Sequence, residues 1–182
     1  MQTEIIIAGF GGQGVLFAGQ LMAYAALGAG KEVTWIPSYG PEMRGGTANC
    51  TVTISDEEIG SPMVRNPQAA MVLNLPSFDK YEPLVKADGV LIVNSSIISR
   101  QSERNDLKVV YIPANEIAET IGDKRMTNMV LLGSLLANLP VLSFAEVEKA
   151  LAEHTPERHK RFLSMNVEAL KQGAAFLAQP VK

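Results

Sequence analysis

The chain has 182 residues, of which 47% are apolar and 19% are charged, and its formal net charge is −3 at pH 7. This balance excludes the broad basic surface that binds nucleic acid or an anionic membrane. The charged share is below the roughly 25% typical of soluble domains, so we expect a partner protein to cover part of the surface.

Cysteine content and apolar run length narrow the protein class further. Cys50 is the only cysteine, so this chain cannot build a disulfide framework or a four-cysteine iron–sulfur site. No basic, apolar leader opens the sequence, and the longest apolar segment, 129–142, is shorter than the roughly 20 residues of a membrane span. We expect a cytoplasmic protein without membrane segments, folded as one domain over residues 1–182.

Apolar segments of strand length alternate with helical segments through the first two thirds of the chain. Three of the strand segments are unbroken apolar runs, which are typical of strands covered on both faces. The alternation predicts βαβ crossovers and an α/β fold: a Rossmann-like, open, mostly parallel sheet with helices on both faces. The expected strands are 4–9, 32–37, 70–75, 89–94 and 108–113, and the expected helices are 13–29, 77–87 and 115–122.

Two regions depart from this alternation. The segment 47–59 alternates and is rich in β-branched residues, which predicts extra strands inserted after strand two. After residue 125 only helical patterns remain, so we expect an all-helical C-terminal part. Ser143 and Glu146 have the spacing of a capping box, and Thr155 before Pro156 predicts a helix N-cap with proline at the first position. The basic run 158–161 is interpreted as a solvated helix face.

The stretch "GFGGQG" at 9–14 follows the first strand and opens the first helix. Gly9, Gly11 and Gly14 match the G-x-G-x-x-G pattern, in which bare backbone and a helix N-terminus create an anion site. Small residues at Gly14, Ala18, Ala25 and Ala29 lie near one helix face and predict close packing on the sheet. The alternative is that some of these glycines serve packing alone.

Two kinds of nucleotide-binding site can be tested against the residues around this loop. A Walker A loop requires Lys and Ser or Thr after the last glycine, but Val15 and Leu16 stand there. A dinucleotide site prefers an acid at the end of strand two, and the nearest later acid, Glu42, lies beyond a proline and a glycine. A free-standing NAD(P)-dependent oxidoreductase and a nucleotide-binding module therefore stay open as weaker alternatives.

A second unusual loop, "SYGPEMRGGTANC" at 38–50, leaves the carboxyl end of strand two, where open α/β sheets bind ligands. Arg44 stands among glycines and is suited to grip a phosphate or a carboxylate. The plain alternative is an ion pair of Arg44 with Glu42 or Glu4. His154 and His159 lack metal-ligand spacing and are interpreted as surface histidines, so we expect no metal site and no catalytic residue in the isolated chain.

The two loops together resemble the gamma subunit of 2-oxoacid:ferredoxin oxidoreductases. The resemblance rests on "AGFGGQGV" and "PSYGPEMRGGTANCTV", with further matches at "ISDEEIGSP", "LIVNSSII" and "RMTNMVLLGSLL", and it covers nearly the whole chain. It implies a subunit of a cytoplasmic complex that oxidatively decarboxylates a 2-oxoacid to acyl-coenzyme A and reduces ferredoxin. The wording of the second loop is most similar to the 2-oxoglutarate and branched-chain types.

The resemblance also implies where cofactors and partners lie. Thiamine diphosphate, magnesium and the iron–sulfur clusters belong to the alpha, beta and ferredoxin-like delta subunits, and this chain binds no cofactor alone. It packs on the thiamine diphosphate subunits and helps to enclose the coenzyme A site, and an isolated chain could form a homodimer instead. The residues that match the family's two loops, and that we expect to face this site, are Gly9, Gly11, Gly12, Gln13 and Gly14, then Ser38, Tyr39, Gly40, Pro41, Glu42, Arg44, Gly45 and Gly46.

Overall fold

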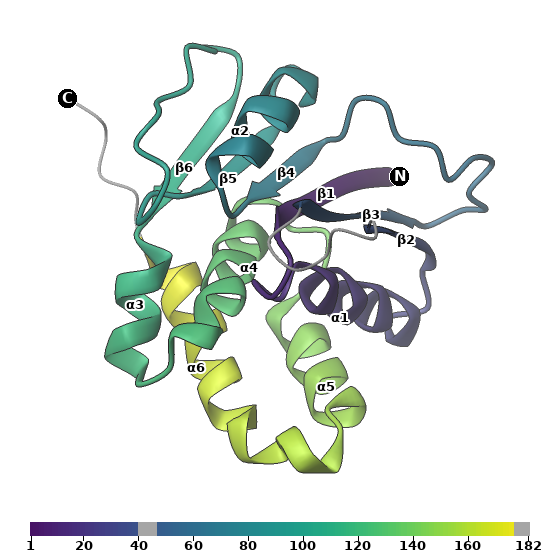
Figure 1. Cartoon of the computed structure of the whole chain (residues 1–182). Helices are drawn as coiled ribbons and strands as arrows, with labels where there is room; N and C mark the ends of the chain where they lie inside the picture. The colour runs from purple at the N-terminus through teal and green to yellow at the C-terminus, as the bar shows by residue number, and fades with distance from the viewer. Residues whose placement is uncertain (40–46, 177–182) are drawn as a thin grey trace.

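The computed structural model describes residues 1–39 and 47–176 and contains one six-stranded sheet in the order β2-β3-β1-β4-β5-β6. Strands β1, β4, β5 and β6 pair in parallel, whereas β3 runs antiparallel to both of its neighbours, β1 and β2. The predicted open, mostly parallel α/β sheet is therefore confirmed (Figure 1). The strands are β1 (Gln2–Phe10), β2 (Glu32–Tyr39), β3 (Thr47–Ser55), β4 (Ala69–Val72), β5 (Val90–Asn94) and β6 (Lys108–Ile112).

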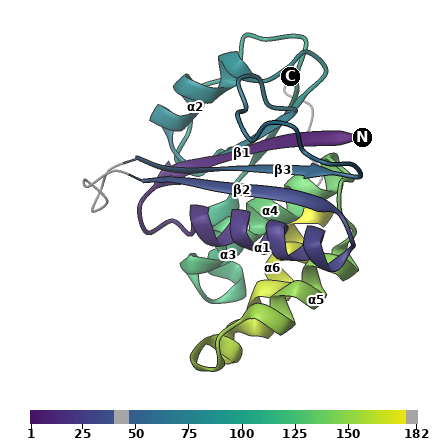
Figure 2. The same cartoon turned by 90° about the vertical axis from the view of Figure 1, so that its right-hand side faces the viewer.

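Helices cover both faces of the sheet, but unequally. One face carries a large apolar core shared with five helices, whereas the other carries a smaller core with α2 (Figures 1 and 2). Side chains of β1 alternate between the two cores, with Ile5 and Ile7 in the larger and Ile6 in the smaller. The five helices on the larger core are α1 (Val15–Gly28), α3 (Ala114–Ile121), α4 (Thr127–Asn138), α5 (Phe144–His154) and α6 (Leu163–Ala175), and α2 spans Leu75–Tyr81.

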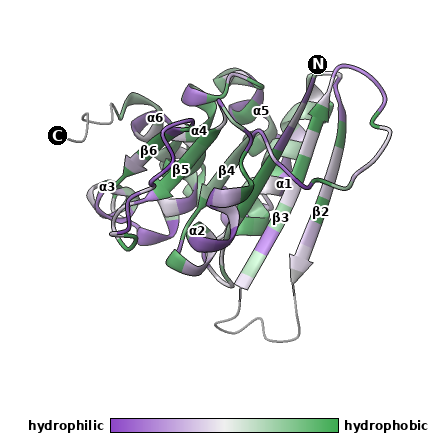
Figure 3. Ribbon diagram, turned by 90° about the horizontal axis from the view of Figure 1, so that it is seen from above, coloured by the Kyte–Doolittle hydropathy of each residue, from purple (hydrophilic) through white to green (hydrophobic). Residues whose placement is uncertain are grey.

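Strand hydropathy follows this double coverage. Every residue of β4 and β5 is buried, as the unbroken apolar runs predict. The strands β2 and β3 are paler toward residues 40–46 than β4 and β5 are (Figure 3), and α1 is the helix that packs most extensively on them. Within residues 1–39 and 47–176, no helix combines the length and the apolarity needed to cross a lipid bilayer.

The insertion after strand two is simpler than predicted. A single strand, β3, returns antiparallel between β2 and β1, and residues 56–68 form neither helix nor strand. The turn of this hairpin, 40–46, lies outside the described residues. Ser38 and Tyr39 therefore belong to β2 itself, and Thr47 pairs with Phe10 in β1. The insertion separates β1 from β2 by one strand, which periodicity alone does not reveal.

The helix boundaries in the structure can be compared with the capping residues predicted from the sequence. The capping box of α5 is confirmed, since Ser143 and Glu146 bond reciprocally to each other's backbone. The predicted helix 77–87 begins earlier than expected, because Asn74 caps α2. It also ends earlier, at Tyr81, and is followed by the 3₁₀ helix η1 (Glu82–Leu84), which contains Pro83.

The predicted N-cap at Thr155 is wrong. Thr155 ends α5, and its hydroxyl donates to the Leu151 carbonyl one turn back. Pro156 instead starts a second 3₁₀ helix, η3 (Glu157–Phe162), which leads into α6. Another 3₁₀ helix, η2 (Lys124–Met126), directly precedes α4.

Candidate functional site

The glycine loop occupies the carboxyl end of β1 and the start of α1, as the sequence predicts. Gly12 and Gly14 have φ angles of 93° and 75°, a left-handed backbone that side chains with a Cβ rarely adopt. Gly14 is the N-cap of α1 and offers no side chain to the first helical N–H groups. Those N–H groups point toward the loop, which is the usual arrangement of an anion site.

Other loop residues are committed to holding this shape. Gln13 folds back so that its side-chain oxygen accepts from the Phe10 N–H at 2.6 Å. A Cβ on Gly9 would lie 2.9 Å from the Leu73 Cβ, so this glycine lets the loop approach β4. The carbonyl of Gly14 accepts from the Asn128 amide at 3.1 Å. By contrast, no described atom lies within 4 Å of a Cβ built on Gly12, so the space beside Gly12 is open to a ligand.

Cationic side chains from a distant part of the chain line this open space. Lys124 and Arg125 of η2 form one wall of a hollow of about 250 Å³, with Gly12 and Gln13 on the other side. Asp123 caps η2 and binds the Arg125 guanidinium at 2.9–3.0 Å through Nε. This side-chain hydrogen bond holds the pKa of Asp123 below its usual range and raises that of Arg125.

Arg125 keeps donors for a ligand in spite of its ion pair. Its Nε and Nη2 donate to Asp123, which occupies two of the five guanidinium N–H groups. The guanidinium is also stacked 4.6 Å from the Phe162 ring centre, and 67% of the side chain is exposed. The cation is thus fixed in position while its remaining N–H groups can reach an anion.

The amide of Asn115 completes the polar wall of the same hollow. Its oxygen accepts from the Asn94 amide at 3.1 Å and lies 3.3 Å from the Thr127 hydroxyl, whose proton is donated to the Lys124 carbonyl at 2.8 Å. The bond from Asn94 fixes the Asn115 amide so that its NH₂ group stays available as a donor. The hollow therefore presents donors from Asn115, Lys124 and Arg125 beside the bare backbone of Gly12.

A second, more apolar cleft of about 430 Å³ adjoins the first and shares Gly12 and Arg125 with it. Aromatic rings from Phe17 and Phe162 and the imidazole of His159 line this cleft. An anion bound by the polar hollow could therefore carry a planar or apolar extension into the adjoining space. The remaining residues around this cleft are Gly14, Met126, Asn128, Thr155, Pro156 and Asn166.

The basic run 158–161 is exposed, as expected of a solvated face, but it lies beside this site. His159 lines the second cleft, and the Arg161 guanidinium stacks 4.6 Å from the Phe162 ring centre. His154 and His159 are both exposed, so their interpretation as surface histidines is confirmed.

The second sequence loop is only partly described. Ser38 is exposed at the end of β2, and the backbone of Tyr39 pairs with Ala48. The predicted site residues Gly40, Pro41, Glu42, Arg44, Gly45 and Gly46 lie outside the described residues. Glu4, one of the two acids considered for Arg44, binds Lys86 at 2.7 Å.

Sequence reasoning did not select Asn115, Lys124, Arg125 or Asn128 as site residues. They stand more than 100 positions after the glycine loop, and only the fold of α3, η2 and α4 brings them there. For Arg125 and Asn128 the available signal was the stretch "RMTNMV" (125–130), which is part of the family resemblance.

Known proteins are similar to this chain along nearly all of its length. The pyruvate ferredoxin/flavodoxin oxidoreductase family profile matches residues 4–176. The ketoisovalerate oxidoreductase subunit VorA of Methanothermobacter thermautotrophicus is 36% identical over the whole chain, which spans 38% of that relative's length. The 2-oxoglutarate synthase subunit KorC of Methanocaldococcus jannaschii is 37% identical, with 86% of each chain covered.

Solved structures agree with the fold. The gamma subunit of a keto/oxoacid ferredoxin oxidoreductase from Geobacter sulfurreducens superposes with a TM-score of 0.81 at 32% identity, covering 94% of this chain and 96% of that one. A 2-oxoglutarate:ferredoxin oxidoreductase from Magnetococcus marinus, with 2-oxoglutarate, coenzyme A and succinyl-CoA bound, gives a TM-score of 0.87 at 23% identity. The match covers 98% of this chain and 32% of that one, and it supports the fold alone.

Proposed function

Because the chain belongs to the pyruvate ferredoxin/flavodoxin oxidoreductase family, we propose that it is the gamma subunit of a 2-oxoacid:ferredoxin oxidoreductase. The proposed complex oxidatively decarboxylates a 2-oxoacid, transfers the acyl group to coenzyme A and passes the electrons to ferredoxin. The chain would act as one domain over residues 1–182 within a cytoplasmic assembly and would be inactive alone.

The proposed substrate is 2-oxoglutarate or a branched-chain 2-oxoacid. Relatives named for ketoisovalerate and 2-oxoglutarate are 36% and 37% identical to this chain, whereas the pyruvate synthase subunit PorC of Methanothermobacter thermautotrophicus is 32% identical. Selection of the 2-oxoacid would be made by partner subunits, so an assay of the assembled complex decides among these substrates.

The residues present fit coenzyme A better than the other groups that the complex uses. One cysteine cannot ligate an iron–sulfur cluster, and the sequence has no Gly-Asp-Gly thiamine motif. No group of three or more His, Cys, Asp or Glu side chains within residues 1–39 and 47–176 is placed to hold a metal ion. We therefore assign thiamine diphosphate, magnesium and the clusters to the alpha, beta and delta subunits.

Coenzyme A carries phosphate groups, which suit the donors around Gly12. The N-terminus of α1 supplies positive potential, and Arg125 and Lys124 bring cationic N–H donors to the same hollow, each of them paired with one carboxylate, Asp123 or Glu119. When bound, coenzyme A supplies the thiol that accepts the acyl group, while this chain's residues hold and orient its anionic end. The observation that carries this proposal is the convergence of Arg125 and the open face of Gly12 on one hollow.

Arg125→Ala in the reconstituted complex tests the proposal. A charge-assisted hydrogen bond contributes about 1.5–3 kcal/mol, so we expect the KM for coenzyme A to rise about tenfold or more. The KM for the 2-oxoacid should stay unchanged, because that substrate reacts at the partner subunits. Arg100→Ala is the matched control, since Arg100 pairs with Asp79 and is 59% exposed away from the hollow. Equal coenzyme A kinetics in both variants would refute this role of Arg125.

The second loop is part of the same proposal. We propose that Arg44, with Ser38, Tyr39, Gly40, Pro41, Glu42, Gly45 and Gly46, faces the partner subunits or an anionic group of coenzyme A. Arg44→Ala should then weaken either assembly or coenzyme A affinity, which native mass spectrometry and steady-state kinetics separate. If the purified native chain instead carried NAD(H) and no partner subunits, the alternative of a free-standing NAD(P)-dependent oxidoreductase would replace this proposal.

A further inference from the structure

Helix α1 lacks charge to a degree that is unusual for a helix at a protein surface. No charged residue occurs between Ile5 and Gly30, so α1 carries no ionised side chain on any face. Surface helices of globular proteins normally bear polar, charged residues on the side away from the core. A helix that is apolar all round is normally buried on all sides. The outward side of α1 therefore has the composition of an interface.

This outward side is uncovered in the structure. The inward side packs on the sheet through Ala18, Gly19, Met22 and Ala25, all of them buried. Figure 2 shows the side of α1 between β2 and α5 facing the viewer, with no helix or strand in front of it. The outward residues Phe17, Gln20, Tyr24 and Leu27 recur at intervals of three and four, which places them in one stripe along the helix.

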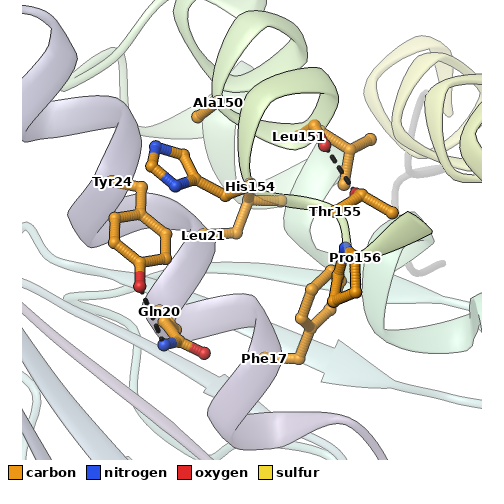
Figure 4. Close-up of a pocket in the computed structure, with 9 residues that line it drawn as sticks. All are labelled: Phe17, Gln20, Leu21, Tyr24, Ala150, Leu151, His154, Thr155 and Pro156. Atoms are coloured by element: carbon orange, nitrogen blue, oxygen red, sulfur yellow. Dashed lines mark hydrogen bonds between the residues drawn. The ribbon is translucent and has the colours of Figure 1, made fainter. Parts of the chain in front are cut away.

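The stripe forms one wall of a groove whose other wall is α5. Figure 4 shows the part near Phe17, a hollow of about 290 Å³ in which the Tyr24 ring stacks on the His154 imidazole with centres 3.8 Å apart. A second hollow of about 390 Å³ continues past Tyr24 to Leu27. Phe17 is 38% exposed and Leu27 is 58% exposed, so large apolar side chains are open to solvent at both ends of the groove.

The charges beside the groove differ in sign between its two ends. The Leu27 end is lined by Glu146, Lys149 and Glu153 of α5. These three side chains carry a formal charge of −1. The Phe17 end is followed by η3, which bears Arg158, Lys160 and Arg161 against one glutamate, Glu157, a formal charge of +2. One end of the groove is thus basic and the other acidic.

We propose that this groove is the interface between two copies of the chain, with their α1 helices packed antiparallel about a twofold axis. In this arrangement the stripe of one copy packs on the stripe of the other, and the basic end of each groove lies against the acidic end of its partner. A twofold interface must be complementary to itself, and a groove with opposite charges at its ends meets that condition. The inference does not depend on coenzyme A binding or on the proposed reaction.

Sedimentation equilibrium of the isolated full chain tests the interface. We expect a dimer with a dissociation constant in the micromolar range, and Leu27→Glu should weaken it at least tenfold by placing a charge in the apolar stripe. Leu27 is 58% exposed, so the variant should keep the wild-type melting temperature at a dilution where both proteins are monomeric. Met63→Glu is the matched control, because Met63 is 79% exposed and does not line the groove. A monomeric wild type at 100 µM, or a dimer unaffected by Leu27→Glu, would overturn the proposal.

Charge reversal provides a test that a folding defect cannot imitate. Glu153→Arg and Arg158→Glu should each weaken self-association, because like charges then face each other across the twofold axis. Mixing the two variants should restore it, since both contacts of the mixed dimer pair opposite charges. A mixture that stays monomeric while each variant melts normally would refute the antiparallel arrangement. Leu27→Glu leaving self-association intact but blocking assembly with the alpha and beta subunits would assign the groove to those partners instead.

Discussion

Two pairs of glycines in this chain have different structural roles. Gly133 of α4 and Gly173 of α6 lie where the two helices cross, and a Cβ on either would overlap the backbone of the other helix. Gly12 and Gly14 lie in the loop after β1, where the left-handed backbone itself demands glycine. The first pair sets how closely two helices pack, and the second sets how a ligand meets the backbone. A glycine-rich sequence is evidence for a ligand only in the second case.

The largest expected effect comes from breaking the helix crossing. A Cβ on Gly133 would stand 2.8 Å from the Leu170 carbonyl carbon and closer still to its oxygen, and backbone cannot rotate away as a side chain can. Gly133→Ala should therefore cost about 3 kcal/mol or more in unfolding free energy. Urea denaturation of the isolated chain measures this loss. Gly28→Ala is the control, because its Cβ would meet nothing within 4 Å, and it should be at least as stable as the wild type, since alanine favours the helix by up to about 1 kcal/mol.

Gly14→Ala combines both kinds of cost. Its Cβ would stand 2.8 Å from the Asn128 Cγ, and alanine at a φ of 75° adds about 1–2 kcal/mol of backbone strain. We expect a total destabilisation of about 2–3 kcal/mol. Adding Asn128→Ala should relieve the overlap but not the strain, so the double variant should recover only part of the loss. Full recovery in the double variant would show that the left-handed backbone contributes nothing.

Gly19 is a packing glycine whose neighbour is a side chain, so its effect should be smaller and reversible. A Cβ there would overlap the Cys50 sulfur and stand 3.1 Å from the Trp35 indole nitrogen. Gly19→Ala should cost about 1–3 kcal/mol, and Cys50→Ala in the same chain should restore most of it by removing the sulfur. Additive losses in urea denaturation would contradict the close contact between α1 and β3.

The thiol of Cys50 gives an independent probe of this contact. Burial raises the pKa of Cys50 to about 12. The folded state therefore holds this proton more tightly than the unfolded chain, whose thiol has a pKa of about 8.5. Stability should fall as pH rises from about 8.5 toward 12, and Cys50→Ala should flatten this slope. Equal slopes in the two proteins, measured by urea denaturation between pH 8 and 10, would contradict the burial.

The sequence predicted the sheet well because its signals were local. Unbroken apolar runs marked β4 and β5, and Ser143 with Glu146 marked the start of α5. The pairing of β3 between β1 and β2 was not predicted, because register depends on contacts across the sheet. The cap assigned to Thr155 was wrong, since the same residue can end one helix as well as begin another, and neighbouring sequence does not distinguish the two.

In the candidate site, too, some residues could be predicted from the sequence and others could not. The backbone of Gly12 and Gly14 follows from the sequence, because a turn from strand to helix after a buried strand needs such residues. Arg125 and Asn115 could not be predicted from the sequence. Arg125 stands 113 positions after Gly12, so no local sequence pattern links it to the loop that it lies beside. Gly19 was missed as well, whereas Ala18 and Ala25, predicted to lie toward the sheet, are buried.

Gly12→Ala should have the smallest effect on stability and so separates the two kinds of glycine most sharply. No described atom lies within 4 Å of the new Cβ, which leaves only about 1 kcal/mol of strain at a φ of 93°. In the reconstituted complex, however, the methyl group would occupy the space where we propose that phosphate meets the backbone. The KM for coenzyme A should rise, while Gly133→Ala, in whatever fraction folds, should leave it unchanged. If Gly12→Ala bound coenzyme A normally, the glycine loop would serve the turn alone, and the contrast between the two pairs would reduce to two ways of packing a chain.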